Sequence, residues 1–250
     1  PSSELPAAVV KRAKELGAAD VICELATEDT RQIRFANNSV TASKSWASSE
    51  LDIFMAKDRK LLSTTVSSPR EIERALAELM RRIELMPPSQ TYNGIAQGSH
   101  RYKPFKADKK IGSMLEELYD HVDAAINEAL AAGGERVAGV LYSSSGKTYL
   151  ASSGGQTGEY DGSSIEISVR AMTGDESSGH MVQSATSAKD FMPGDVGKRA
   201  GQLADDSRNP EMGEAGKFDV VFSPMIFANL LEEVGGSGAA GFVDIGRSFF

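Results

Sequence analysis

Two adjacent glutamates, Glu232 and Glu233, come nearest to a catalytic motif in this sequence. They lie in the last turn of a predicted helix that follows a strand-like apolar run at 220–222 and begins at Ser223, a typical helix start. A zinc-peptidase helix needs two histidines around such a glutamate, so that the metal can activate a water molecule. Residues 181–250 contain no histidine. The segment therefore has the pattern of a catalytic helix without zinc ligands.

The phrase LLEEVGGSG at 230–238 resembles the TldD/PmbA family, whose members are described as peptidases and as modulators of DNA gyrase. In catalytic TldD-type members the corresponding phrase is LLHExxxHG, in which both histidines bind zinc and the glutamate is the general base. Here Glu232 takes the first histidine slot, Glu233 keeps the glutamate slot, and Ser237 takes the second histidine slot. This departure resembles the PmbA (TldE) branch, which pairs with a catalytic subunit. The resemblance implies no catalytic residue, metal ligand or cofactor in this chain, with zinc only in the partner.

Other residues with chemical potential are predicted to be structural. The run at 236–241 matches G-x-G-x-x-G, but it follows a helix instead of a strand, so it indicates a turn and not a dinucleotide site. Cys23 shares one strand face with Val21 and Leu25, as a buried small side chain would. The serines at 143–145 lack the context of a nucleophile elbow and indicate a turn.

The three histidines and the single tryptophan leave more room for interpretation. His100, His121 and His180 have no local metal-ligand spacing and are predicted to be surface or structural, although a site assembled from distant segments stays open. Trp46 stands among small polar residues, so it could contact a partner or a peptide, or pack partly buried against a helix layer.

Composition excludes several classes of function. The net charge of −8 and the pI near 5.1 argue against direct binding to nucleic acid or to an anionic membrane surface. No apolar run is long enough to span a bilayer, and a single cysteine permits no internal disulfide. With no pattern of a secretion signal, we expect a cytoplasmic protein.

The order of predicted elements repeats along the chain. Each copy has the pattern α-β-β-β-β-α, which predicts an α+β protein with antiparallel sheets and helices packed on them. We expect a first unit at 1–88, a connector at 89–111, a second unit at 112–210, and the start of a C-terminal region at 211–250. Turns are expected at Asn37-Asn38 and near Asp58. The family resemblance implies a largely β C-terminal region that is missing or cut here.

The leading hypothesis from the resemblance is a noncatalytic PmbA/TldE-like subunit of a cytoplasmic TldD/TldE-type metallopeptidase assembly. It would pair with a TldD-like subunit or form a homodimer, and it would hold extended peptide. Long ribbons around 39–49 and 154–164 offer strand edges for such a peptide. Two alternatives remain: a TldD-like hydrolase with ligands beyond residue 250 and Glu233 as its base, or an interaction protein that modulates other machinery such as DNA gyrase.

Overall fold

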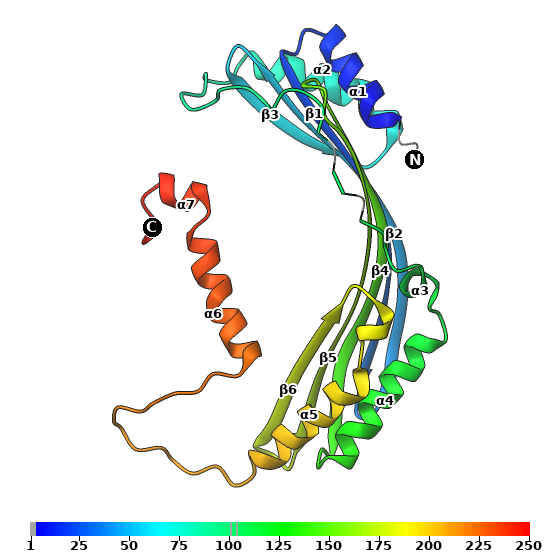
Figure 1. Cartoon of the computed structure of the whole chain (residues 1–250), viewed down its shortest axis with the longest axis vertical. Coiled ribbons are helices and arrows are strands. Elements are labelled where there is room, and N and C mark those ends of the chain that lie inside the picture. Colours follow the sequence, from blue (N-terminus) through cyan, green and yellow to red (C-terminus); the bar gives the residue numbers. More distant parts are fainter. Residues whose placement is uncertain (1–3, 101, 104) are drawn as a thin grey trace.

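The protein is built around one antiparallel sheet of six strands in the order β3-β2-β1-β4-β5-β6. The computed structural model describes residues 4–100, 102–103 and 105–250. The sheet is long and curved, with helices near both of its ends (Figure 1). The strands are β1 (Asp20–Ala36), β2 (Ser39–Lys57), β3 (Lys60–Val66), β4 (Arg136–Ser152), β5 (Thr157–Thr173) and β6 (Ser177–Ala185). The predicted α+β class is therefore confirmed.

The two halves of the chain repeat one pattern of elements. In the first half, α1 (Leu5–Glu15) precedes β1 to β3 and α2 (Ile72–Ile83) follows them. In the second half, α3 (Lys109–Ser113) and α4 (Glu117–Ala131) precede β4 to β6, and α5 (Pro193–Asp206) follows them. The halves join where β1 pairs antiparallel with β4, from Ile22 opposite Ser152 to Phe35 opposite Gly139. The duplication thus produces one continuous sheet, where separate sheets were expected.

Each half contains three strands, where the sequence predicted four shorter ones. The polar residues at 27–30 suggested a break, but β1 runs through them, and β2 likewise runs through the polar residues at 43–50. The physical reason is that most side chains at 27–29 of β1 and at 43–50 of β2 are exposed, so the polar ones are solvated without ending the strand. The repeating unit is therefore α-β-β-β-α.

Both predicted hairpin turns are present, and their backbone geometry explains them. Asn37 and Asn38 have φ of 51° and 65°, and Asp58 and Arg59 have φ of 51° and 62°. Two successive residues in the left-handed region make the tight turn whose twist matches antiparallel strands. Asn38 also receives a hydrogen bond at its Oδ1 from the N–H of Val137, so this turn is tied to the start of β4.

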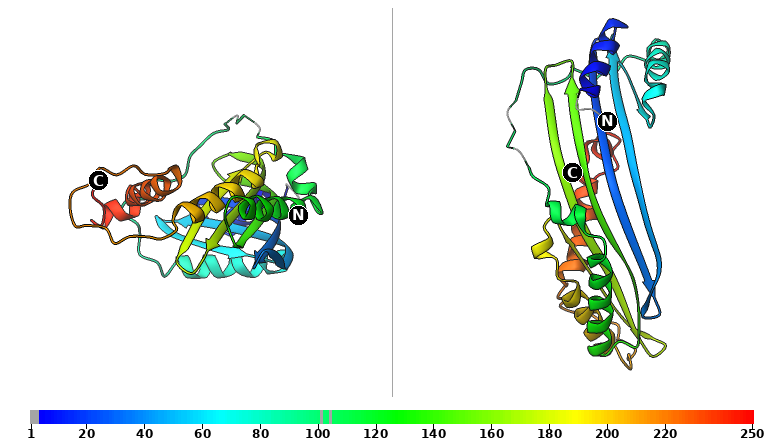
Figure 2. Two further views of the ribbon diagram at one scale, coloured as in Figure 1. Left: turned by 90° about the horizontal axis from the view of Figure 1, so that it is seen from below. Right: turned by 90° about the vertical axis from the view of Figure 1, so that its right-hand side faces the viewer.

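Two hydrophobic cores lie at opposite ends of the sheet. One contains Val21, Cys23 and Leu25 of β1 beneath α1 and α2, and the other contains Ile33 and Phe35 of β1 with α4 and α5. All five are odd-numbered, and successive strand residues point to opposite faces, so both helix layers cover the same face. The second view in Figure 2 agrees, with α1 and α4 on the near side of the sheet. Among the described residues, no helix layer covers the opposite face.

The C-terminal segment is helical and lacks the strand expected at 220–222. The run at 220–222 is not a strand, because no neighbouring strand pairs with it, and residues 242–245 lie mainly in helix α7 (Ala240–Asp244). Helix α6 (Pro224–Ser237) begins as predicted, with Ser223 as its N-cap, but it continues beyond the turn of Glu232 and Glu233 that was predicted to be its last. Figure 1 shows α6 and α7 standing apart from the sheet. Among the described helices, none is long and apolar enough to cross a membrane.

Candidate functional site

The degenerate motif lies on exposed α6, and its residues do not fit a zinc ion. Glu232 and Glu233 are solvent-exposed neighbours, whose side chains point about 100° apart around a helix. The Ser237 hydroxyl donates a hydrogen bond to the carbonyl oxygen of Glu233 at 3.0 Å. A carboxylate and a hydroxyl that bonds its own helix are a poor substitute for two imidazoles. Within the described ranges, no group of three or more His, Cys, Asp or Glu side chains could hold a metal ion.

The three histidines lie on separate elements. His100 is in the connector near the ring of Tyr102, at a centroid distance of 6.3 Å. His121 on α4 packs edge-on against Phe191 at 5.3 Å, and burial lowers its pKa. His180 on β6 has its Nε2 atom 2.9 Å from the hydroxyl oxygen of Ser168 on β5, and burial again lowers the pKa. The structure does not bring the histidines together.

Cys23 occupies the core, as the sequence predicted. Its side chain is completely buried in β1. Burial, with smaller contributions from Asp52 and Glu24, raises the pKa of the thiol to about 12. Because the thiolate is the nucleophilic form, a thiol with this pKa is unreactive near neutral pH.

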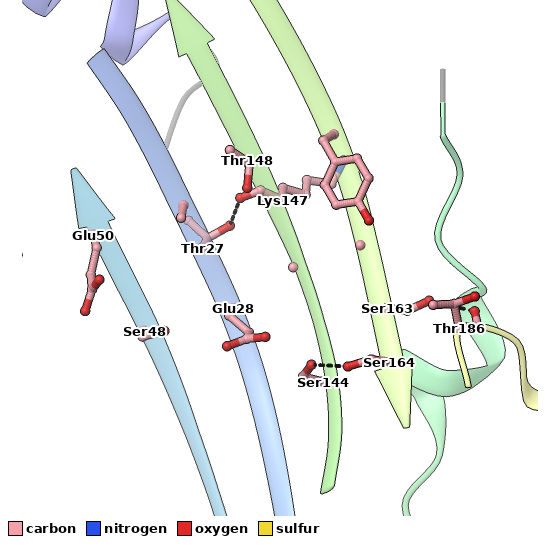
Figure 3. Close-up of a pocket in the computed structure, with 14 residues that line it drawn as sticks. Thr27, Glu28, Ser48, Glu50, Ser144, Lys147, Thr148, Ser163, Ser164 and Thr186 are labelled. Carbon is pink, nitrogen blue, oxygen red and sulfur yellow. Dashed lines mark hydrogen bonds between the residues drawn. The ribbon is translucent and has the colours of Figure 1, made fainter. Parts of the chain in front are cut away.

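A groove of about 530 Å³ lies across the middle of the sheet. Its walls come mainly from even-numbered residues of β1, β2, β4 and β5, which point to the helix-free face (Figure 3). The lining is dominated by small hydroxyl side chains, with two carboxylates, one lysine and one tyrosine. The lining residues are Ala26, Thr27, Glu28, Ser48, Glu50, Ser144, Gly146, Lys147, Thr148, Tyr160, Gly162, Ser163, Ser164 and Thr186.

Two glycines line the groove on neighbouring strands. Gly146 lies directly opposite Glu28 of β1 on one side and Gly162 of β5 on the other. A Cβ atom added to Gly146 would lie 2.2 Å from the carbonyl oxygen of Thr27. The close approach of β1 therefore requires glycine at this position. Local sequence motifs do not reveal a cross-strand row of this kind, since the row exists only once the strands are paired.

Cross-strand contacts organise the rest of the groove wall. The hydroxyl groups of Ser144 and Ser164 are 2.9 Å apart, as the dashed line in Figure 3 shows. Lys147 forms an ion pair with Asp161 at 3.1 Å, and this pair raises the pKa of the lysine. Ser144 therefore lies within β4, so the turn predicted at 143–145 is wrong. Ser143 of this run is buried, and its hydroxyl donates a hydrogen bond to the carbonyl oxygen of Ile111 in α3, so a polar run can continue a strand where its polar groups find partners.

The sheet has two unpaired edges beside this groove. Strand β3 covers only Leu51–Lys57 of β2, so the segment from Ser39 to Glu50 pairs with β1 alone. Strand β6 similarly begins its pairing at Ile165, so residues 157–164 of β5 pair with β4 alone. These segments coincide with the ribbons whose edges the sequence suggested. Trp46 lies on the β2 edge and is 45% exposed, so it does not pack under a helix layer.

The two edges differ in what lies beside them. Near the β5 edge, the connector is held by a hydrogen bond from the N–H of Gly98 to the carbonyl of Gly154 at 2.8 Å. Phe105 stacks on Tyr160 at 5.4 Å, and the N–H of Asp108 donates to the Ser163 hydroxyl at 2.9 Å. In the part of the chain that the structure describes, no such contact covers the outer side of residues 43–50. The β2 edge is therefore the more open of the two.

The second half of the sheet and its helices match a known protein family. Residues 105–208, which span α3 to α5, match the PmbA/TldA metallopeptidase central domain. Over these residues, the resemblance to the TldD/PmbA family predicted from the sequence is confirmed. Among curated proteins, none matches the chain.

Solved structures share the fold at low sequence identity. A protein from Bacteroides thetaiotaomicron named as a modulator of DNA gyrase has a TM-score of 0.77 and 16% identity, over 94% of this chain and 56% of its own. A Thermotoga maritima protein of the same name has a TM-score of 0.69 and 16% identity, over 85% of this chain and 50% of its own. TldE from Thermococcus kodakarensis has a TM-score of 0.66 and 12% identity, over 82% of this chain and 47% of its own. The chain thus spans about half the length of these structures.

Proposed function

We propose that this chain is a noncatalytic, PmbA/TldE-like subunit of a cytoplasmic metallopeptidase assembly, in which it holds extended or unfolded peptides for proteolysis. The observation that carries the proposal is the uncovered middle of the sheet. There the unpaired β2 edge from Ser39 to Glu50 contributes Ser48 and Glu50 to the groove.

An extended peptide suits this place because its backbone can pair with the free edge. Main-chain hydrogen bonds supply affinity in such strand addition, and they do not depend on the side chains of the peptide. The edge from Ser39 to Glu50 offers room for a strand of about 40 Å at about 3.3 Å per residue. Serine and alanine side chains along this edge are small, which leaves its backbone accessible.

The proposal assigns hydrolysis to a partner subunit. Because the residues in the zinc slots do not fit the metal, we place zinc in a TldD-like chain. The family assignment supports such a pairing.

Binding of unfolded peptide tests the proposal directly. We expect a fluorescent, unstructured peptide of neutral sequence to bind, and a small folded domain of the same net charge not to bind. Salt should change the affinity for the neutral peptide little, because few charges take part.

N-methylation of alternate peptide amides supplies a matched control. Alternate N–H groups of a strand point to the same side. One methylation register therefore removes the donors to the edge, and the other removes donors that point away. We expect the first register to abolish binding and the second to preserve it. Equal binding by both registers, or by the folded domain, contradicts strand addition.

A further inference from the structure

The helix-free face of β1 and β2 carries a stripe of carboxylates that leads into the groove. Glu24 lies directly opposite Asp52, and Glu50 is the next residue along β2 on the same face. Glu28 pairs with Ser48, which makes Glu50 its diagonal neighbour at about 7–8 Å between backbones. Figure 3 shows Glu28 and Glu50 on neighbouring strands within the groove.

The lysine that lines the groove does not neutralise the stripe, because Lys147 is paired with Glu159 and Asp161 of β5. In the described part of the chain, none of these four carboxylates takes part in an ion pair of the kind that Lys147 forms with Asp161. The nearest basic residue of β2 on this face, Lys44, lies opposite Gln32, roughly 13 Å along the strand from the position of Glu28. Like charges directly opposite each other in an antiparallel pair are destabilising. The stripe thus costs stability that no ion pair within the described residues offsets.

Position distinguishes Glu28 and Glu50 within the stripe. Both line the groove, and Glu50 is also the last residue of the unpaired edge of β2. A peptide strand added to this edge would place alternate side chains over the helix-free face. A side chain of such a peptide that reaches toward Glu50 therefore meets two exposed carboxylates, and a lysine or arginine would be complementary to them.

We propose that the groove selects extended peptides with a basic side chain, which Glu28 and Glu50 bind, so that the substrate class is unfolded peptide containing lysine or arginine. This inference rests on the proposed function. Main-chain pairing supplies binding that is independent of peptide sequence and of salt. The two carboxylates add a preference that depends on the peptide sequence and on the salt concentration.

Three peptides of one unstructured sequence test the preference. They carry lysine, norleucine or glutamate at a single central position, and anisotropy measures their affinity for the full chain. We expect lysine to bind about fivefold more tightly than norleucine, as one to two solvent-exposed charge pairs allow, and glutamate to bind most weakly. At 1 M salt, where the Debye length is about 3 Å, the difference between lysine and norleucine should disappear.

The variant Glu28→Gln/Glu50→Gln assigns the preference to these side chains. It should bind the lysine and norleucine peptides equally. Glu166→Gln removes a carboxylate of the same face from β5, outside the groove, and should keep the preference. Circular dichroism checks that each variant is folded.

The possible failures are distinguishable. Tight binding of all three peptides without preference, or a preference that survives in the double variant, overturns this inference and leaves the proposed function in place. If none of the peptides binds, both are overturned.

Discussion

At the scale of single residues, the groove depends on positions where only glycine fits. Gly146 lies in β4 between β1 and β5, and the carbonyl oxygen of Thr27 occupies the place that a Cβ atom would need. Gly158 of β5 differs, because a Cβ atom there would meet only the Cβ of Leu150 at 3.9 Å, an ordinary contact. The two glycines therefore form a matched pair for mutation.

Gly146→Ala should destabilise the protein by about 1–3 kcal/mol, the usual cost of overpacking. Gly158→Ala should change the free energy of unfolding little. Urea denaturation of both variants measures the difference. Equal stability of the two variants would show that β1 and β4 separate at Gly146 without cost.

Metal content is also decided by single residues. Because Glu232 and Ser237 stand in the two histidine slots, purified protein should carry no stoichiometric zinc after dialysis. Elemental analysis measures this, and about one tightly held zinc per chain would contradict the noncatalytic assignment. The variant Glu232→His/Ser237→His, measured in parallel, shows whether α6 can present a zinc pair once the imidazoles are restored.

At the scale of elements, Asp108 fastens the end of the connector to the second half of the sheet. One of its carboxylate oxygens accepts hydrogen bonds from the N–H of Ala188 at 2.8 Å and the hydroxyl of Ser187 at 3.1 Å. The other accepts from the N–H of Lys110 at 2.9 Å, which caps α3. These hydrogen bonds lower the pKa of Asp108, and the bond from Ala188 has the largest effect.

Asp108→Asn should destabilise the protein at pH 7 and matter less in acid. A carboxyl group whose pKa is lower in the folded state contributes stability above its unfolded pKa of about 3.9, and loses it as pH falls through the folded pKa. The gap in urea midpoint between native protein and variant should therefore narrow between pH 7 and pH 3. Asp175→Asn, in the exposed turn between β5 and β6, serves as the control. A gap that is constant with pH would mean that the charge of Asp108 is not responsible.

At the scale of the whole molecule, much apolar surface remains uncovered. Phe227, Leu231 and Val234 on α6 are exposed by 50%, 53% and 44%. Contiguous exposed apolar surface commonly marks an interaction site. The free edges of β2 and β5 add unpaired backbone groups, which native proteins usually protect.

We expect the functional unit to be a dimer, either with a TldD-like partner or with a second copy of this chain. Sedimentation velocity of the chain alone, of the partner alone and of their mixture measures the state of each. A monomer in all three conditions would contradict the expectation. A mixture that sediments as a single heavier species favours the heterodimer, whereas a dimer of the chain alone favours the homodimer.

The sequence by itself determined the local features of this protein. Asn37-Asn38 and Asp58 mark turns because few residues tolerate positive φ, and Ser223 marks a helix start because its side chain accepts the bond of a free N–H group. The loss of both motif histidines, and the burial of Cys23 among apolar neighbours, also follow from residue type and spacing.

Only the tertiary structure decided how these elements meet. Local preference could not show that β1 continues through its polar middle, because that depends on the solvation of its side chains in the folded sheet. Pairing of β1 with β4 is a contact between residues more than a hundred positions apart, and it alone brings Glu28 opposite Gly146. Strand register is set by such long-range packing, so the groove, its glycines and its unpaired carboxylates emerged only when the two halves joined in one sheet.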